Sequence, residues 1–129
     1  MNESIIIIDF GSQVTKLIAR RIREFGVFSQ IEPFNKVKKK LLCNNSVKGI
    51  IFSGGPKSVH EKNSPKIDDF IYEQEIPILG ICYGLQLIAK KFGGKIIPSK
   101  DREFGKTKIK LKKKWVLYSS ALSNKILRL

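Results

Sequence analysis

Residues 76–86, IPILGICYGLQ, place a cysteine between an apolar run and an amphipathic run. The apolar residues 76–81 predict a buried β-strand, and the apolar residues that follow Gly84 recur at helical spacing. Cys82 therefore lies in a sharp strand-to-helix turn, as in a nucleophile elbow. The N-terminus of the next helix favours the thiolate, which is the form that attacks a carbonyl carbon. The alternative is a buried structural cysteine.

The same reading extends to the rest of the chain. Apolar and β-branched runs predict strands at residues 4–9, 27–32, 47–52, 76–81, 95–98, 107–111 and 115–118. Helical spacing predicts helices between Ser12 and Gly26, at 36–43, at 66–74 and after Cys82. Ser12 is placed to cap the first of these helices and Gly26 to end it. The strand at 4–9 is apolar enough to be buried on both faces.

Strands that alternate with helices at this spacing indicate βαβ units, and hence an α/β fold with a mostly parallel sheet and helices on both faces. Functional loops of such sheets follow the carboxyl ends of the strands. Three loops of this chain do so, at residues 10–13, 53–58 and 82–86. We expect these three loops to meet at one edge of the sheet.

The loop that begins Ser53-Gly54-Gly55-Pro56 invites a phosphate-binding interpretation, but its spacing is not that of a P-loop and Pro56 lacks a donor N–H. An ATP-pyrophosphatase loop would carry Asp in place of Lys57. A better interpretation is an oxyanion hole, in which a glycine N–H faces the charge that develops on a carbonyl oxygen. A simple turn after a strand is the alternative.

The chain of 129 residues is strongly basic, with 25 lysines and arginines against 11 acidic residues. Such a balance can mark a nucleic-acid surface. Only five of the basic residues are arginines, however, and no aromatic residues interleave with the lysine runs to stack on bases. The composition therefore favours A+T-rich codon usage over a nucleic-acid partner.

The remaining chemistry-bearing residues are few. Cys43 and Cys82 form neither a disulfide framework nor a metal-binding pair, which favours the cytoplasm. The apolar run at residues 5–8 is too short for a membrane span. His60 is the one histidine, and a solvated surface role is the simpler interpretation of a lone loop histidine.

Five segments occur in an order that resembles a known family: IIDFGSQ at 7–13, ARRIRE at 19–24, SGGP at 53–56, GICYGLQ at 80–86 and REFG at 102–105. Together they are similar to the N-terminal class I glutamine amidotransferase domain of the GMP synthase family. The cysteine loop alone would equally fit anthranilate, carbamoyl-phosphate and CTP synthases. The first and last segments favour the GMP synthase family.

The resemblance implies a partial doubly wound, flavodoxin-like sheet. It implies that Cys82 attacks the side-chain amide of glutamine and that the backbone N–H groups of Gly55 and Tyr83 hold the oxyanion. Gly54, Gly55 and Gln86 would bind glutamine, and no metal is implied. The ammonia would pass to ATP-activated XMP to make GMP, so the synthetase part of a full-length, homodimeric enzyme would require ATP and Mg, whereas this chain requires no cofactor.

The sequence also departs from the family. The family's His-Pro-Glu segment follows the cysteine at a distance that this chain does not reach, and residues 112–129 diverge after an amidotransferase part at 1–111. We therefore expect the chain to lack the synthetase and dimerisation domains and to have a separate synthetase domain or chain as a partner. We expect a truncated form with impaired or no glutaminase activity. The alternatives are a non-enzymatic basic binding module that keeps the glutamine-binding loops, or the glutaminase part of another class I enzyme.

Overall fold

A computed structural model describes residues 3–55, 62–94, 108–110 and 126–128. The chain divides into two units, Met1–Ile96 and Ile97–Leu129. The elements of the first unit are β1 (Ser4–Asp9), α1 (Thr15–Glu24), β2 (Phe28–Pro33), α2 (Lys39–Leu42), β3 (Val47–Phe52), the 3-10 helix η1 (Asp69–Gln74), β4 (Ile78–Gly80) and α3 (Tyr83–Lys91). In the second unit, β5 (Lys108–Lys110) pairs antiparallel with β6 (Ile126–Arg128).

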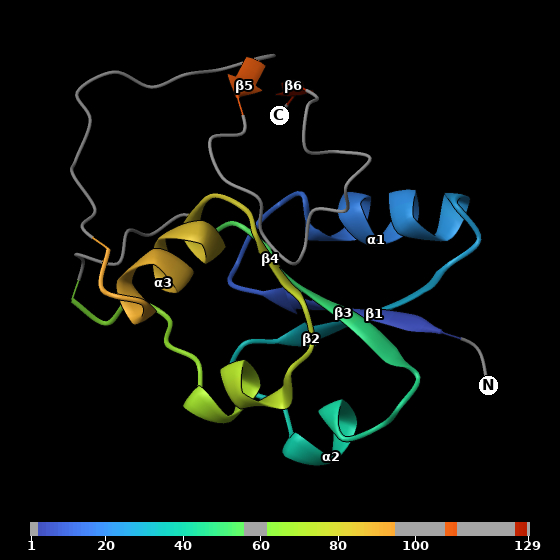
Figure 1. The fold of residues 1–129 in the computed structure, drawn as a ribbon, viewed down its shortest axis with the longest axis horizontal. Helices are drawn as coiled ribbons and strands as arrows, with labels where there is room; N and C mark the ends of the chain where they lie inside the picture. Colours follow the sequence, from blue (N-terminus) through green and yellow to red (C-terminus); the bar gives the residue numbers. More distant parts are fainter. Residues whose placement is uncertain (1–2, 56–61, 95–107, 111–125, 129) are drawn as a thin grey trace. The chain divides into compact units, whose positions relative to one another are not determined.

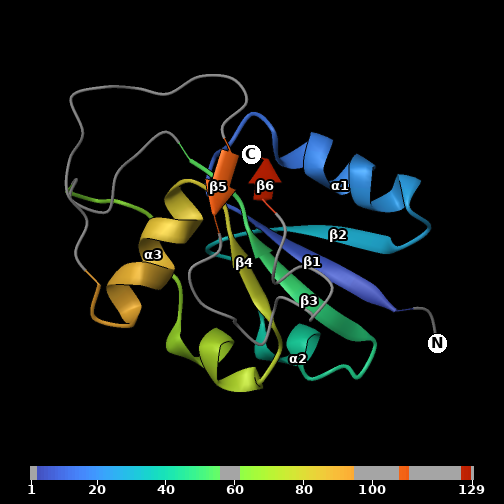
Figure 2. The same ribbon diagram turned by 45° about the horizontal axis from the view of Figure 1, so that its top comes forward.

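The first unit is built on a four-stranded sheet in the order β2-β1-β3-β4, in which every pair of neighbours is parallel (Figures 1 and 2). This order is the beginning of the flavodoxin-like arrangement, in which the second strand lies outside the first. Ile6, Ile7 and Ile8 in β1 are at most 1% exposed. The predicted α/β fold, and the burial of this strand on both faces, are therefore confirmed.

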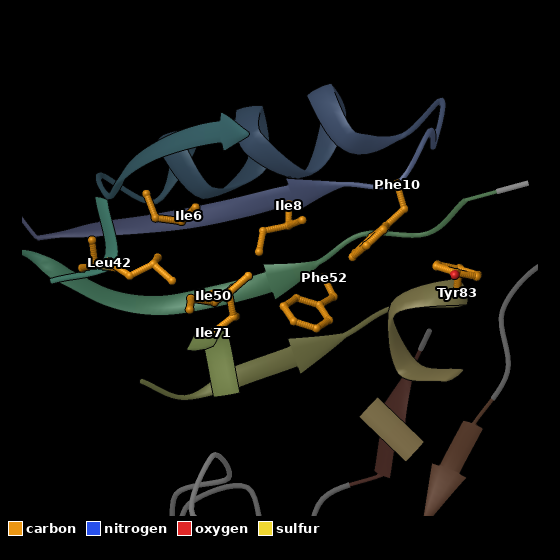
Figure 3. Close-up of a cluster of buried hydrophobic side chains, with 9 residues drawn as sticks. Ile6, Ile8, Phe10, Leu42, Ile50, Phe52, Ile71 and Tyr83 are labelled. Atoms are coloured by element: carbon orange, nitrogen blue, oxygen red, sulfur yellow. The ribbon is translucent and has the colours of Figure 1, made fainter. Parts of the chain in front are cut away.

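Helices cover both faces of the sheet. Ile6 and Ile8 point to one face together with Ile50 and Phe52 of β3, because side chains alternate along a strand. Figure 3 shows these side chains on the side of the sheet away from α1, and Leu42 at the end of α2 completes that cluster. The other face is covered by α1, whose Ala19 is 4% exposed and contributes to the packing.

Helix α1 begins at Thr15 and not directly after Ser12, so the predicted N-cap at Ser12 is wrong. The Ser12 hydroxyl accepts a hydrogen bond from the Val14 N–H at 3.1 Å, which closes a local turn before the helix starts. Asp9 stabilises the same turn as well, because its Oδ1 accepts hydrogen bonds from the N–H groups of Gly11 and Ser12 at 2.8 and 3.2 Å. Gly26 ends the helix as predicted, with a φ of 80°.

Two other elements differ from the sequence predictions. The helix expected at 66–74 is a 3-10 helix that begins at Asp69. Short connecting segments often adopt this tighter form. The strand expected at 76–81 is limited to Ile78–Gly80. Pro77 has no N–H to extend the ladder, and its carbonyl instead accepts the Ile50 N–H at 2.9 Å.

In the second unit, β6 was not expected, and β5 is shorter than the strand predicted at 107–111. The strands predicted at 95–98 and 115–118 lie outside the described residues.

The junction between β3 and α3 is tight enough to require glycine. A Cβ added to Gly84 would lie 2.4 Å from the carbonyl oxygen of Phe52 and 2.5 Å from its Cβ. Gly49, also in β3, has room, since the nearest atom to an added Cβ there is the Cγ1 of Ile5 at 3.8 Å.

We expect Gly84→Ala to lower the free energy of unfolding by about 1–3 kcal/mol or more, because overpacked backbone cannot move aside as a side chain can. The matched control Gly49→Ala should change it by less than about 1 kcal/mol. Urea unfolding of both variants checks this, and equal stabilities would contradict the close contact at Gly84.

Tyr72 of η1 connects this segment to α3. Its ring packs edge-on against Phe52 at 5.8 Å and Phe92 at 5.9 Å between centroids. The Lys91 ammonium lies 5.5 Å from the ring centroid and 2.9 Å from the Asp69 carboxylate. Burial raises the pKa of Tyr72 to about 12, and the charges of Asp69 and Tyr83 act in the same direction.

This raised pKa predicts a loss of stability at alkaline pH. The unfolded chain loses the phenol proton near a pKa of about 10, whereas the folded chain keeps it to about 12. The contribution of Tyr72 is thus constant below about pH 10 and is lost as the pH rises towards the folded pKa. Unfolding experiments between pH 9 and 12 should show a steeper decline for the wild-type chain than for Tyr72→Phe, and parallel declines would contradict the assignment.

Candidate active site at the Cys82 turn

Cys82 lies between β4 and α3 in a backbone conformation that residues other than glycine rarely adopt, with φ 49° and ψ −113°. Its exposed thiol follows Ile81, whose N–H is bonded to the Phe52 carbonyl at 2.9 Å. The strand-turn-helix arrangement predicted from the sequence is therefore confirmed. The alternative of a buried structural cysteine is wrong.

The glycines beside Cys82 allow the tight backbone path of the turn without unusual angles of their own, since neither Gly80 nor Gly84 has a positive φ. Their role is to permit close approach, since a Cβ on Gly80 would lie 2.7 Å from the backbone of Leu85. Cys82 itself carries the strained conformation, which costs of order 1–3 kcal/mol and is typical of functional sites.

Three loops meet at this turn, as the sequence predicts. A Cβ added to Gly54 would lie 3.2 Å from the Cβ of Cys82, 3.8 Å from its Sγ and 3.8 Å from the Ser12 hydroxyl. A Cβ on Gly55 would lie 2.6 Å from the carbonyl oxygen of Phe10. The loops after β1, β3 and β4 thus approach one another closely at Gly54 and Gly55. Residues 56–58 of the middle loop lie outside the described ranges.

The side chain of Tyr83 is buried, so only the backbone of this residue belongs to the candidate site. The ring is 2% exposed and packs 5.4 Å from the ring of Phe10, as Figure 3 shows. Its hydroxyl donates a hydrogen bond to the carbonyl of Pro65. The predicted function of Tyr83 concerns its N–H, which lies in the first turn of α3.

Gln86 lies one turn into α3, and its N–H donates to the carbonyl of Cys82 at 3.2 Å. This residue is partly buried, so its side chain is neither sealed in the core nor wholly in solvent. The assignment of Gln86 to glutamine binding stays a prediction. His60 lies outside the described residues.

A buried polar network beneath the loops was missed by the sequence analysis. The Thr15 hydroxyl lies 3.1 Å from Asp9 Oδ1 and 3.1 Å from the Ser53 hydroxyl. Thr15 and Ser53 are 2% and 0% exposed. A signal was present in the sequence, because Asp9 ends a fully apolar strand and Thr15 is a polar residue on the packed side of α1.

Within the described residues 53–55, the loop after β3 offers no side chain to a phosphate or a metal ion, because the Ser53 hydroxyl is buried and bonded to Thr15. Residues 56–58 of this loop lie outside the described ranges. Within the described ranges, no group of three or more His, Cys, Asp or Glu side chains could hold a metal ion.

No helix among the described residues is long and apolar enough to cross a membrane.

The family model described as glutamine amidotransferase class-I matches residues 6–126. Since this covers nearly the whole chain, the chain belongs to the class-I glutamine amidotransferase family.

Within this class, the similar proteins are GMP synthases. The chain is 52% identical over 109 residues to GMP synthase (glutamine-hydrolyzing) of Caldicellulosiruptor saccharolyticus, covering 84% of this chain and 21% of that protein. It is 48% identical over 119 residues to that of Bacillus cytotoxicus, covering 92% and 23%. The chain thus spans about a fifth of the length of these relatives.

A solved structure has the same fold. It is a protein from Thermoplasma acidophilum described as one of the subunits of GMP synthase. The two chains superpose with a TM-score of 0.70 and are 34% identical, and the match covers 86% of this chain and 55% of that one. This likeness confirms the class I amidotransferase type of the α/β fold.

The backbone strain at Cys82 leads to a stability prediction. Cys82→Gly should be more stable than Cys82→Ala by about 0.5–2 kcal/mol, because relief of about 1–3 kcal/mol of strain exceeds the entropy cost of glycine, about 0.5–1 kcal/mol. Alanine is the appropriate reference, since both variants lack the thiol. Chemical unfolding measures the difference, and a less stable glycine variant would show that the turn is unstrained.

Proposed function

We propose that this chain carries the nucleophile part of a glutaminase site, in which Cys82 attacks the side-chain amide of glutamine. The observation that carries the proposal is the exposed Cys82 thiol on a strained turn that touches Gly54 of the loop after β3. Strain and exposure at a cysteine between a strand and a helix serve nucleophilic catalysis and contribute nothing to packing.

The reaction proceeds in two steps. The Cys82 thiolate forms a bond to the amide carbon, and the amide oxygen takes up negative charge. Collapse of this intermediate breaks the C–N bond, and the nitrogen leaves as ammonia after it gains a proton. Water then hydrolyses the glutamyl thioester to glutamate and restores the thiol.

The oxyanion would be held by the N–H groups of Gly55 and Tyr83. Two features support this assignment: Gly55 directly follows Gly54, which approaches Cys82, and the Tyr83 N–H lies in the first turn of α3. Burial of the Tyr83 side chain holds the second donor in place as charge develops. Gln86, together with Gly54 and Gly55, would position the substrate.

The similarity to GMP synthases supports a proposal for the molecule that accepts the ammonia. We propose that it aminates ATP-activated XMP to form GMP, as a step of purine nucleotide biosynthesis. We propose that a synthetase domain or a separate chain carries out this ATP-dependent step.

The diazoketone analogue of L-glutamine, in which a diazomethyl group replaces the amide nitrogen, tests the glutaminase site. Its ketone stands where glutamine has its amide carbonyl. The diazo carbon takes up a proton from water, and the thiolate then forms a C–S bond to that carbon as N₂ leaves. Both cysteines of the chain are exposed, so Cys43 is an internal control. We expect the analogue to label Cys82 and leave Cys43 unmodified, whereas iodoacetamide labels both; peptide mass spectrometry distinguishes the sites.

Labelling of Cys82 should also saturate with concentration and be slowed by L-glutamine. Equal modification of Cys43 and Cys82 by the diazoketone, with no protection by glutamine, would contradict the proposal. Cys82→Ala should abolish labelling and confirm the peptide assignment.

A further inference from the structure

The oxyanion donor proposed on Gly55 belongs to the peptide group that joins Gly54 to Gly55, and glycine-rich peptides rotate easily. A trans peptide is planar, so its C=O and N–H point in opposite directions. Whatever holds the Gly54 carbonyl therefore also sets the direction of the Gly55 N–H.

The Ser53 hydroxyl holds that carbonyl. It donates to the Gly54 oxygen at 3.3 Å, accepts the Phe10 N–H at 3.4 Å and is 0% exposed. The Ser53 N–H continues the sheet ladder by donating to Ile8 O at 3.0 Å. Ser53 thus joins a rigid strand end to the peptide that must be oriented.

The direction of the Ser53 hydroxyl depends on Thr15. Thr15 has one hydroxyl proton, and its acceptors are Asp9 Oδ1 and Ser53 Oγ at 3.1 Å and the Ser12 carbonyl at 3.4 Å. The Ser53 hydroxyl also has one proton. Where Thr15 donates to Ser53 Oγ, the Ser53 proton is directed to the Gly54 carbonyl.

We propose that Ser53 and Thr15 are positioning residues, which hold the Gly54–Gly55 peptide through two buried hydroxyls, with Thr15 donating to Ser53 and Ser53 donating to the Gly54 carbonyl. They touch neither Cys82 nor substrate, and they act by aiming the Gly55 N–H at the oxyanion. This inference rests on the glutaminase function proposed above.

The test compares two rates of Cys82 modification in the full 129-residue chain. The diazoketone analogue of L-glutamine places its ketone oxygen in the oxyanion site, whereas iodoacetamide alkylates the thiolate by direct displacement and needs no oxyanion donor. The ratio of the two rates therefore reports the oxyanion site separately from thiol reactivity.

We expect Ser53→Ala to lower the diazoketone rate about 10- to 100-fold, less than the roughly 10²–10³-fold loss of an entire donor. The iodoacetamide rate should stay within twofold of wild type. Thr15→Val should act in the same direction to a smaller extent, and Thr15→Ser should restore the wild-type ratio.

Ser29→Ala is the matched control. Ser29 is also 0% exposed, and its hydroxyl donates to the Ala19 carbonyl at 2.9 Å and accepts from Arg23 Nε at 3.1 Å. It lies in β2, outside the three loops. This variant should lose stability, measured by thermal unfolding, without a change in the rate ratio.

The outcomes separate the two proposals. A saturable wild-type reaction with an unchanged ratio in both Ser53→Ala and Thr15→Val would overturn the positioning inference alone. A parallel fall of both rates would overturn it as well, because it would show a general structural effect. Lack of saturation in the wild-type chain would overturn the glutaminase site and this inference together. If Ser53→Ala does not fold, the rate ratio of Thr15→Val, which preserves side-chain shape, tests the positioning inference.

Discussion

Helix α3 begins so close to the end of β3 that only glycine fits at position 84, with the Phe52 carbonyl 2.4 Å from where a Cβ would stand. That contact leaves the chain very little length between β4 and the helix, and Cys82 must span it with a φ of 49°. In this conformation the thiol of Cys82 is exposed and is not buried in the apolar core. Both the strain at Cys82 and the exposure of its thiol follow from one backbone contact.

The candidate site consists of an exposed cysteine thiol above a layer of buried side chains. Beneath it, Phe10 packs against Phe52 and Tyr83 at 5.6 and 5.4 Å between ring centroids, so the residue after β1, the last residue of β3 and the first residue of α3 share one aromatic cluster. Beside this cluster, Asp9 orders the loop after β1 through two backbone N–H groups. The catalytic groups that we propose are consequently a single side chain and backbone amides, held by side chains that never face the substrate. Preorganised donors of this kind stabilise developing charge without further rearrangement.

Much of the fold and of the candidate site could be predicted from the sequence, because the residue patterns that determine them are local. The isoleucines of β1, the glycines of two loops and the cysteine between a strand and a helix each determine nearby backbone, and their order predicted the parallel sheet and the meeting of the loops. The predictions failed for two different reasons. The N-cap at Ser12 was wrong for a local reason, because Asp9 Oδ1 accepts the N–H groups of Gly11 and Ser12 and the helix begins only at Thr15. The bond between Thr15 and Ser53 spans 38 positions and depends on the assembled sheet. The close packing of the glycines beside Cys82 against Phe52 and Leu85 likewise required the tertiary structure.

The central claim is that the Gly55 and Tyr83 amides face an oxyanion formed on a substrate bound to Cys82. The most direct measurement is the amide proton NMR spectrum of the chain with the aldehyde analogue of L-glutamine, which forms a hemithioacetal with the thiol. We predict that the Gly55 and Tyr83 amide protons shift downfield more than any other backbone amide, and that the shifts vanish in Cys82→Ala. Formation of the adduct without a shift at Gly55 would contradict the account.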